Sequence, residues 1–193
     1  STLIFHQAKY NQNNTLGETI MSNLILPGKE ITFSNDEIIV SKTDLKGLIT
    51  YTNTTFCKVA GYTERELLGQ PHSIIRHDAM PRCVFKLIWD RIQQGCEIFG
   101  YVVNKTRFND YYWVLAHVTP SFDDDMKIVG YHSNRRVPDR RVVESIISPL
   151  YAQLLEIENS TSNRKDGMNK AFDTLVNILE QKGIEYDEFI LTL

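Results

Sequence analysis

Long apolar runs, cysteines and excess charge are all scarce in this 193-residue chain. No stretch approaches the roughly 20 consecutive apolar residues of a membrane-spanning helix, and no basic segment leads into the apolar core of a secretory signal. With 21 basic against 24 acidic residues, the chain lacks the positive charge that accompanies binding to nucleic acid or anionic membranes. We therefore expect a soluble, cytoplasmic protein that neither binds nucleic acid nor inserts into a membrane.

The cysteines Cys57, Cys83 and Cys96 are odd in number and form no CxxC pair. Their spacing predicts neither a zinc site nor a disulfide framework, so we expect reduced and mostly buried thiols. No motif combines a nucleophile, a base and an orienting acid. We therefore expect no catalytic residues and no metal site, and we do not expect an enzyme.

Composition divides the chain into three segments. Residues 1–35 are rich in Asn, Gln and Thr, which predicts a loosely held N-terminal leader or a flanking helix. Residues 36–138 show regular strand and helix patterns and predict one folded domain. Residues 139–193 carry apolar residues at near-helical spacing, which predicts a C-terminal helical extension of two amphipathic helices joined by a polar linker at 159–167.

The order of elements in the central segment indicates its fold. Two extended runs around the Lys46–Gly47 turn predict a hairpin, and capping residues after it predict two short helices. Apolar residues at helical spacing then predict a longer helix that ends at Gly95. Three extended segments follow, at about residues 98–105, 111–122 and 127–136. This order predicts an α+β fold with a five-stranded antiparallel sheet and helices on one side, plus flanking amphipathic helices.

Three stretches of this segment carry a family resemblance: "TNTTFCKVAGYTERELLGQPHSIIRHDAMP", "VVNKTRFNDYYWVLAHVTP" and "IVGYHSNRR". Residues 36–138 closely resemble a PAS sensor domain of the FAD-binding type found in bacterial aerotaxis and energy-taxis receptors. The resemblance implies the PAS fold, an FAD cofactor and a role as a sensor of redox state, oxygen or cellular energy. FMN in place of FAD, a heme-binding gas sensor and a cofactor-free interaction or dimerisation module remain alternatives, because the same fold serves all of them.

The segment from Pro71 to Pro81 concentrates charge beside two isoleucines. A guanidinium can hold phosphate oxygens with two parallel hydrogen bonds, and an imidazole can add a donor. The resemblance implies that Arg76 and His77 contact FAD in this way. The family usually reads RHPDMP, whereas here the acid is Asp78 and the residue before the methionine is Ala79. Any role of the family's acid must therefore shift by one residue or be absent.

Four more candidate cofactor contacts follow from the same resemblance. Asn104 stands where flavin-binding PAS domains place an amide against the polar edge of the ring, and Trp89 matches the family's helical tryptophan. His132 takes the place of the glutamine by which LOV photoreceptors sense the reactive nitrogen of the flavin. His72 stands at the position of the LOV adduct cysteine, so cysteine-adduct photochemistry is not expected. For a heme, His72 or His77 is the candidate axial ligand.

Strand alternation assigns the two faces of the segment around Trp113. The series Tyr112, Val114, Ala116 and Val118 is expected to face the cavity. Trp113 and His117 then lie on the outer face, where a flanking helix or a second subunit can cover them. Because the sequence contains no recognisable output domain, we expect signalling by protein–protein contact with a membrane-bound chemotaxis-type receptor or another signalling protein, from a likewise expected homodimer.

Overall fold

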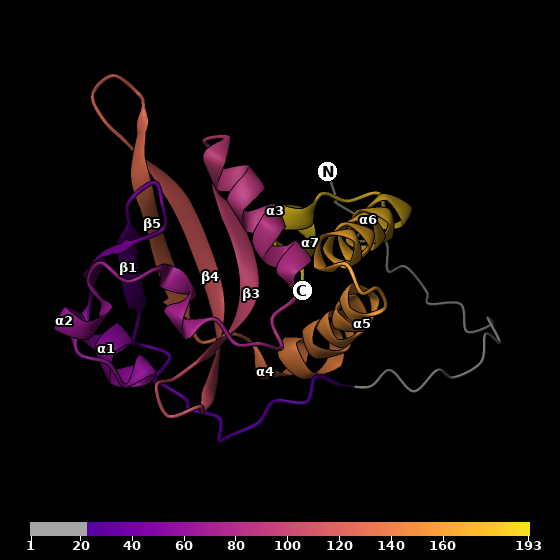
Figure 1. The fold of residues 1–193 in the computed structure, drawn as a ribbon, viewed down its shortest axis with the longest axis horizontal. Helices are drawn as coiled ribbons and strands as arrows, with labels where there is room; N and C mark the ends of the chain where they lie inside the picture. The colour runs from indigo at the N-terminus through magenta and orange to yellow at the C-terminus, as the bar shows by residue number, and fades with distance from the viewer. Residues whose placement is uncertain (1–22) are drawn as a thin grey trace, which may run out of the picture.

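The computed structural model describes residues 23–193, which are organised around one antiparallel sheet (Figure 1). Its strands are β1 (Ile39–Thr43), β2 (Ile49–Thr52), β3 (Ile98–Lys105), β4 (Tyr111–Phe122) and β5 (Ile128–Arg136). They lie in the order β2-β1-β5-β4-β3, and every neighbouring pair is antiparallel. The predicted five-stranded antiparallel sheet is confirmed.

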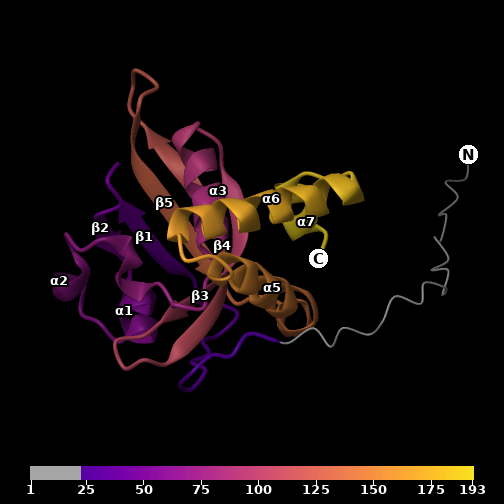
Figure 2. The same cartoon turned by 45° about the vertical axis from the view of Figure 1, so that its right-hand side comes forward.

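Four helices connect β2 to β3: α1 (Thr54–Ala60), α2 (Glu64–Leu67), the 3₁₀ helix η1 (His72–Ile75) and α3 (Arg82–Gln93). The predicted caps are present. The Asn53 side chain accepts from the first turn of α1, Gly61 ends that helix in the left-handed conformation at φ 76°, and Thr63 and Glu66 form a capping box. Helix α3 runs beside β3 and β4, whereas α1 packs at the β1 end (Figures 1 and 2).

The two faces of the sheet are covered by different parts of the chain. On the inner face, Ala116 and Val118 border a cavity beneath α3, as the alternation predicts. On the outer face, the buried Trp113 packs against Tyr151 at 6.2 Å between ring centroids. His117 is stacked on a neighbouring strand residue and lies 2.6 Å from a carboxylate of Glu97. The predicted helix cover of the outer face is confirmed at Trp113.

The N-terminal segment is described from residue 23 onward, so the predicted leader or flanking helix falls largely outside the described residues. Residues 23–35 contain no helix, and Glu30 forms an isolated bridge with Tyr111. The Ile31 backbone N–H donates to the Tyr111 carbonyl at 2.7 Å, and the Tyr111 N–H donates to the Lys29 carbonyl at 3.0 Å. This segment therefore lies beside the start of β4.

The C-terminal extension consists of α4 (Arg140–Val142), the π-helix η2 (Val143–Ile147), α5 (Ser148–Asn159), α6 (Arg164–Lys182) and α7 (Tyr186–Leu191). The two predicted amphipathic helices are present, and α7 is an addition. Helix α6 begins inside the predicted linker because the Asn163 side chain caps its first turn. A Cβ at Gly167 would lie 2.1 Å from the Glu158 carbonyl oxygen, so α5 and α6 approach too closely there for any larger residue.

Both edges of the sheet are covered by other parts of the chain. At the β3 edge, the Phe99 N–H donates to an Asp187 carboxylate oxygen at 3.3 Å, and the Tyr151 hydroxyl donates to the Tyr101 carbonyl at 2.6 Å. At the opposite edge, β2 exchanges two backbone hydrogen bonds of 2.8 Å with residues 69–70. The helices after residue 139 are therefore attached to the sheet through β3.

Two general expectations concern the cysteines and the membrane. All three cysteines are free, but only Cys83 is fully buried, and Cys57 and Cys96 are half-buried. The free thiols agree with the expectation, and burial is complete only for Cys83. Between residues 23 and 193, no helix combines the length and apolar character needed to cross a bilayer.

Candidate ligand-binding site

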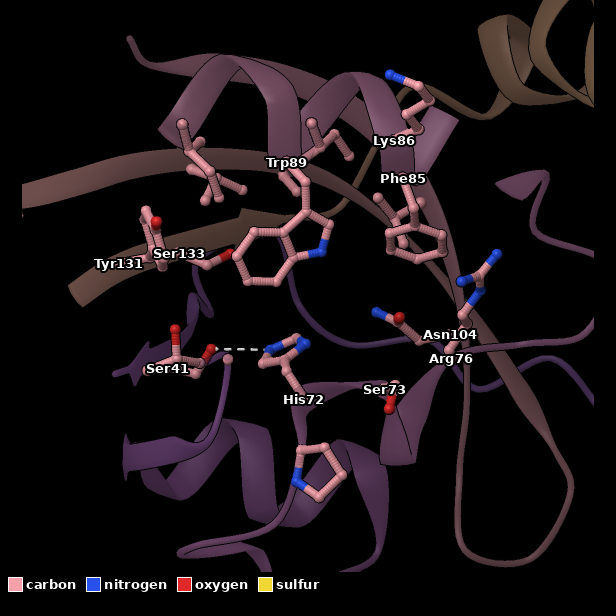
Figure 3. A pocket seen from close by; sticks show the side chains of 18 of the residues that line it. Ser41, His72, Ser73, Arg76, Phe85, Lys86, Trp89, Asn104, Tyr131 and Ser133 are labelled. Atoms are coloured by element: carbon pink, nitrogen blue, oxygen red, sulfur yellow. Dashed lines mark hydrogen bonds between the residues drawn. The ribbon is translucent and has the colours of Figure 1, made fainter. Parts of the chain in front are cut away.

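A cavity of about 510 Å³ lies between the inner face of the sheet, η1 and α3 (Figure 3). This volume is within the range of roughly 300–1,000 Å³ that small-molecule and cofactor sites occupy. Five of the six predicted contact residues border the cavity: His72, Arg76, Trp89, Asn104 and His132.

The walls of the cavity are mainly apolar. One turn after another of α3 contributes a side chain, and the facing strands contribute small or branched ones: Phe85, Ile88, Trp89, Ile92, Val102, Ala116 and Val118. The Trp89 indole meets the Tyr131 ring edge-on, at 5.4 Å and 89°. Apolar and aromatic walls of this kind are suited to an aromatic ligand.

One end of the cavity is cationic and partly exposed. Arg76, Arg82 and Lys86 border it, and the last two side chains are 19% and 34% exposed. The Arg76 guanidinium lies over the Phe85 ring at 4.1 Å, and its Nη2 donates to the Met80 carbonyl at 3.4 Å. Burial lowers the pKa of Arg76, whereas Glu158 raises it. This end, the mouth of the cavity, offers donors for an anionic group.

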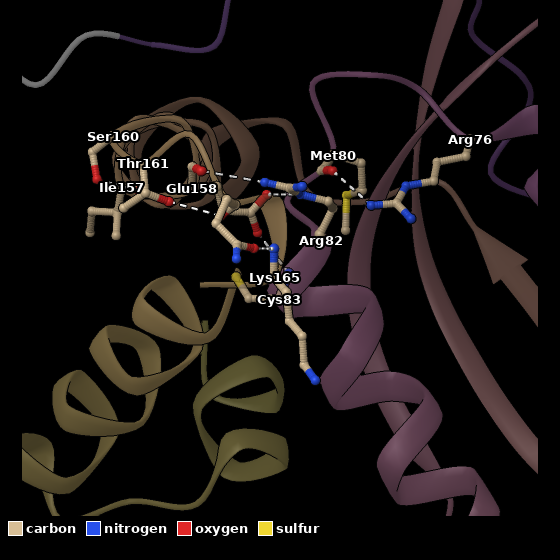
Figure 4. A network of polar contacts seen from close by, with 10 residues as sticks. Arg76, Met80, Arg82, Cys83, Ile157, Glu158, Ser160, Thr161 and Lys165 are labelled. Carbon is tan, nitrogen blue, oxygen red and sulfur yellow. Dashed lines mark hydrogen bonds and ion pairs between the residues drawn. The ribbon is translucent and has the colours of Figure 1, made fainter. Parts of the chain in front are cut away.

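Arg82 also connects the mouth to the C-terminal helices (Figure 4). Its Nε donates to Glu158 Oε2 at 2.9 Å, and the backbone N–H of Cys83 donates to Glu158 Oε1 at 2.8 Å. A buried carboxylate of α5 therefore caps the first turn of α3, where the helix dipole favours negative charge. Met168 of α6 borders the same cavity.

His77 does not share the cavity with Arg76. The Arg76 backbone is extended, at φ −69° and ψ 125°, so the next side chain points the other way. The buried His77 ring accepts from the Ala79 N–H at 3.0 Å and lies edge-on to Tyr111 at 6.3 Å. It borders a second, separate cavity. The expectation that Arg76 and His77 grip one ligand together is corrected by this geometry.

The deep end of the cavity holds a chain of polar side chains. His72 Nε2 lies 3.1 Å from Ser41 Oγ, which also accepts from Nη2 of Arg135 (Figure 3). Because a guanidinium has no lone pair to offer, the Ser41 hydroxyl proton is free to donate to His72. This donation would place the proton of a neutral His72 on Nδ1. Burial, assisted by Arg135, lowers the pKa of His72 to about 3.

Asn104 is buried on β3, directly across from Tyr112 of β4. Its backbone forms a bridge with Arg76, which ties the mouth to the floor of the cavity. Both residues lie where a ligand in the cavity would reach them. Their role as cofactor contacts remains a prediction.

His132 borders the cavity, but the strand register turns its imidazole away. Its cross-strand partners are Lys42 and Thr119, whereas Ser133 pairs with Ser41 and lies on the cavity face. Burial, and then Lys42, lower the pKa of His132. The side chains that β5 directs inward are those of residues 131, 133 and 135. The predicted sensing role therefore cannot be carried by the His132 ring as it stands.

Sequence reasoning missed several residues of the site, above all Arg135. In the stretch "SNRR" an arginine reads as exposed, although alternation from the buried Tyr131 would have indicated an inward position for Arg135. Met168 and Glu158 had no comparable indication, because their position depends on how α5 and α6 pack on α3.

Residues 49–135 match the family model of the PAS fold. The sheet order, the helical crossover and the cavity under α3 agree with this match, so this part of the chain has the PAS fold.

Two characterised proteins are also similar to the chain in sequence. It is 39% identical over 122 residues to the aerotaxis receptor of Escherichia coli (strain K12), which is 63% of this chain and 24% of that protein. It is 27% identical over 99 residues to the nitrogen fixation regulatory protein of Klebsiella pneumoniae, or 51% of this chain and 20% of that protein. The chain thus spans a quarter or less of these relatives.

Among solved structures, one described as "Flavin Analogue Sheds Light on Light-Oxygen-Voltage Domain Mechanism" has a TM-score of 0.50 and 16% identity. The similarity covers 64% of this chain and 87% of that one. At this level of identity, it shows a shared fold.

Proposed function

We propose that the chain is a cytoplasmic sensor of redox state, oxygen or cellular energy that binds FAD in its PAS domain. The observation that carries this proposal is the shape of the cavity, which joins apolar aromatic walls to a cationic mouth. A dinucleotide flavin has the matching parts, a flat ring and two phosphates. Riboflavin alone would leave the mouth unused.

The residues of the cavity fit this cofactor. Arg76, held on the Phe85 ring, would donate to phosphate oxygens, while Trp89 would cover one face of the ring. Asn104 would offer its amide to the polar edge. Bound flavin would supply reversible uptake of electrons, and these residues would bind it, orient it and exclude water from it.

The same cavity offers a path for an output signal. Helix α3 forms one wall, and its first turn is capped by Glu158 of α5. A cofactor state can shift these helices only if its contacts differ between the oxidised and reduced forms. A bound flavin would contact Trp89 and Arg82 of α3, and Arg82 pairs with Glu158 of α5.

The partner we propose is a membrane-bound chemotaxis-type receptor or another signalling protein, contacted by a homodimer of this chain. The support is the similarity to an aerotaxis receptor and to a nitrogen fixation regulatory protein. No catalytic step is proposed, because the cavity groups serve binding.

A heme is a weaker fit to the same cavity. A heme iron needs an axial ligand, and His72 Nε2 is engaged with Ser41 while the His132 ring points outward. His77 borders the other cavity.

The experiment is an absorbance spectrum of the protein purified from cells and then mixed with FAD. We expect a yellow protein with a two-banded flavin spectrum. A red protein with a sharp Soret band would show that the cofactor is heme and not flavin. A protein that stays colourless after FAD is added and removed by gel filtration would favour a cofactor-free interaction module.

A further inference from the structure

Arg135 is the most deeply buried cation of the cavity. It is 2% exposed, it lies on β5, and it borders the cavity from the inner face of the sheet. Its Nη2 donates to Ser41, and its guanidinium lies over the Phe56 ring at 4.6 Å. Burial lowers the pKa of Arg135 to about 10, which leaves it cationic at neutral pH.

This cation has no anionic partner in the described part of the chain. None of the ion pairs between residues 23 and 193 includes Arg135, and its Nε and Nη1 make no hydrogen bond there. Burying an unpaired charge is strongly unfavourable, and buried guanidinium groups are ordinarily paired. The missing acceptor must therefore come from something that enters the cavity.

The polar neighbours of Arg135 are neutral groups, and Ser41 accepts one of its N–H groups. The buried Tyr112 hydroxyl lies behind the cavity lining, and burial raises its pKa, so it is no anionic partner for Arg135. His72 can present a proton on Nδ1 if its Nε2 accepts from Ser41, 3.1 Å away. The free N–H groups of Arg135 at this end are complementary to a ligand edge of carbonyl oxygens and aromatic nitrogens.

We propose that Arg135 binds the carbonyl edge of the flavin ring and stabilises the negative charge which that edge gains on reduction. This inference rests on the proposed flavin cofactor. A flavin that takes up two electrons and one proton from an external donor carries one net negative charge, spread over the nitrogen and carbonyl of this edge. A fixed cation in a low-dielectric cavity favours that form, and so raises the midpoint potential.

The two arginines would bind different parts of the cofactor. Arg76 at the mouth would contact phosphates, which riboflavin lacks. Arg135 would contact the ring, which riboflavin and FAD share. Replacing Arg135 should therefore weaken binding of both ligands by a similar factor.

The test compares Arg135→Met and Arg135→Lys with Arg136→Met, which changes the exposed neighbour that points the other way. Arg135→Met should bind riboflavin and FAD about tenfold or more weakly, because a charge-assisted hydrogen bond is lost. Its bound flavin, titrated with dithionite against a reference dye, should have a lower midpoint potential. Arg135→Lys should have a midpoint potential close to that of wild type. Arg136→Met should match wild type in both flavin affinity and midpoint potential.

Flavin-free protein provides an independent readout. Because Arg135 has no anionic partner there, Arg135→Met should melt at the same temperature as wild type or higher. An unchanged potential and riboflavin affinity in Arg135→Met would overturn the inference, and so would a large loss of stability in the flavin-free variant, which would make the guanidinium structural. If wild type binds no flavin, the proposal of a flavin cofactor is wrong. The melting temperatures of wild type and Arg135→Met still test whether Arg135 stabilises the flavin-free protein.

Discussion

At the scale of residues, neighbouring positions serve different cavities. Arg76 and His77 are adjacent in sequence, yet the extended backbone between them sends one side chain to the mouth and the other to a separate cavity. Motif similarity names the pair, but only the geometry separates their roles. The distinction can be tested with two forms of the cofactor.

We expect Arg76→Ala to weaken FAD binding by about 10- to 100-fold, since a charge-assisted phosphate contact is lost. Riboflavin binding should hardly change. His77→Ala and Asp78→Ala should retain FAD affinity, because His77 lies outside the cavity. Titration of flavin fluorescence against protein measures the FAD and riboflavin affinities of each variant and of wild type. If Arg76→Ala lost affinity for FAD and for riboflavin by the same factor, Arg76 would not be a phosphate contact.

His72 links stability to pH. Its folded pKa is about 3, below the ordinary value of 6.5, so protonation favours the unfolded chain. The stability that neutral His72 provides is present above pH 6.5 and is lost as the pH falls toward 3. Between pH 7 and pH 5, flavin-free wild type should lose up to about 2 kcal/mol more than His72→Asn.

Urea unfolding of both proteins at the two pH values measures this difference, in which the other histidines are common to both. Parallel pH profiles would mean that His72 is protonated as readily in the folded protein as in the unfolded chain.

At the scale of elements, the junction between α3 and α5 depends on one carboxylate. Glu158 is buried, pairs with Arg82 and caps α3 through the Cys83 N–H (Figure 4). Burial beside this carboxylate raises the pKa of the Cys83 thiol to about 12, so the thiol stays protonated. The junction is therefore a neutralised pair, and loss of either partner leaves a buried charge.

We expect Glu158→Ala to lower the free energy of unfolding by about 3 kcal/mol, because Arg82 loses its partner and the first turn of α3 loses its cap. Glu156→Ala removes an exposed carboxylate of the same helix and should stay within about 0.5 kcal/mol of wild type. Chemical denaturation monitored by Trp fluorescence compares them, and coincident curves for the two variants would contradict the role of Glu158.

The elements were largely predictable from sequence, whereas the deep end of the site was not. Asn53, Gly61 and the Thr63–Glu66 box are local signals, and they act within a few residues. Burial of Arg135 and Glu158 depends on contacts across the whole chain, with 94 residues separating Arg135 from Ser41. Arginines ordinarily lie at the surface, so the residue type alone predicts an exposed Arg135 and not a buried one without an acidic partner.

At the scale of the whole molecule, the C-terminal helices belong to the folded unit that forms the cavity. They cap α3, cover the β3 edge and contribute Met168 to the cavity. A change of cofactor state can therefore reach them without an intervening domain.

We expect reduction of bound flavin to change amide hydrogen exchange in residues 142–155, because α5 is joined to the cavity through α3. Oxidised and dithionite-reduced protein would be compared under anaerobic conditions, with α2 as an internal reference remote from this junction. Identical protection of residues 142–155 in both states would leave these helices as static packing elements.

The covered edges of the sheet also bear on how copies of this chain can meet. An exposed edge strand is a template for another strand, and hence for aggregation and fibril growth. Here β3 is closed by side chains of α5 and α7, and β2 is only four residues long and bonded to residues 69–70. Intermolecular continuation of the sheet is thereby blocked at both ends, so self-association is directed to side-chain surfaces, which can be remodelled without unfolding the protein.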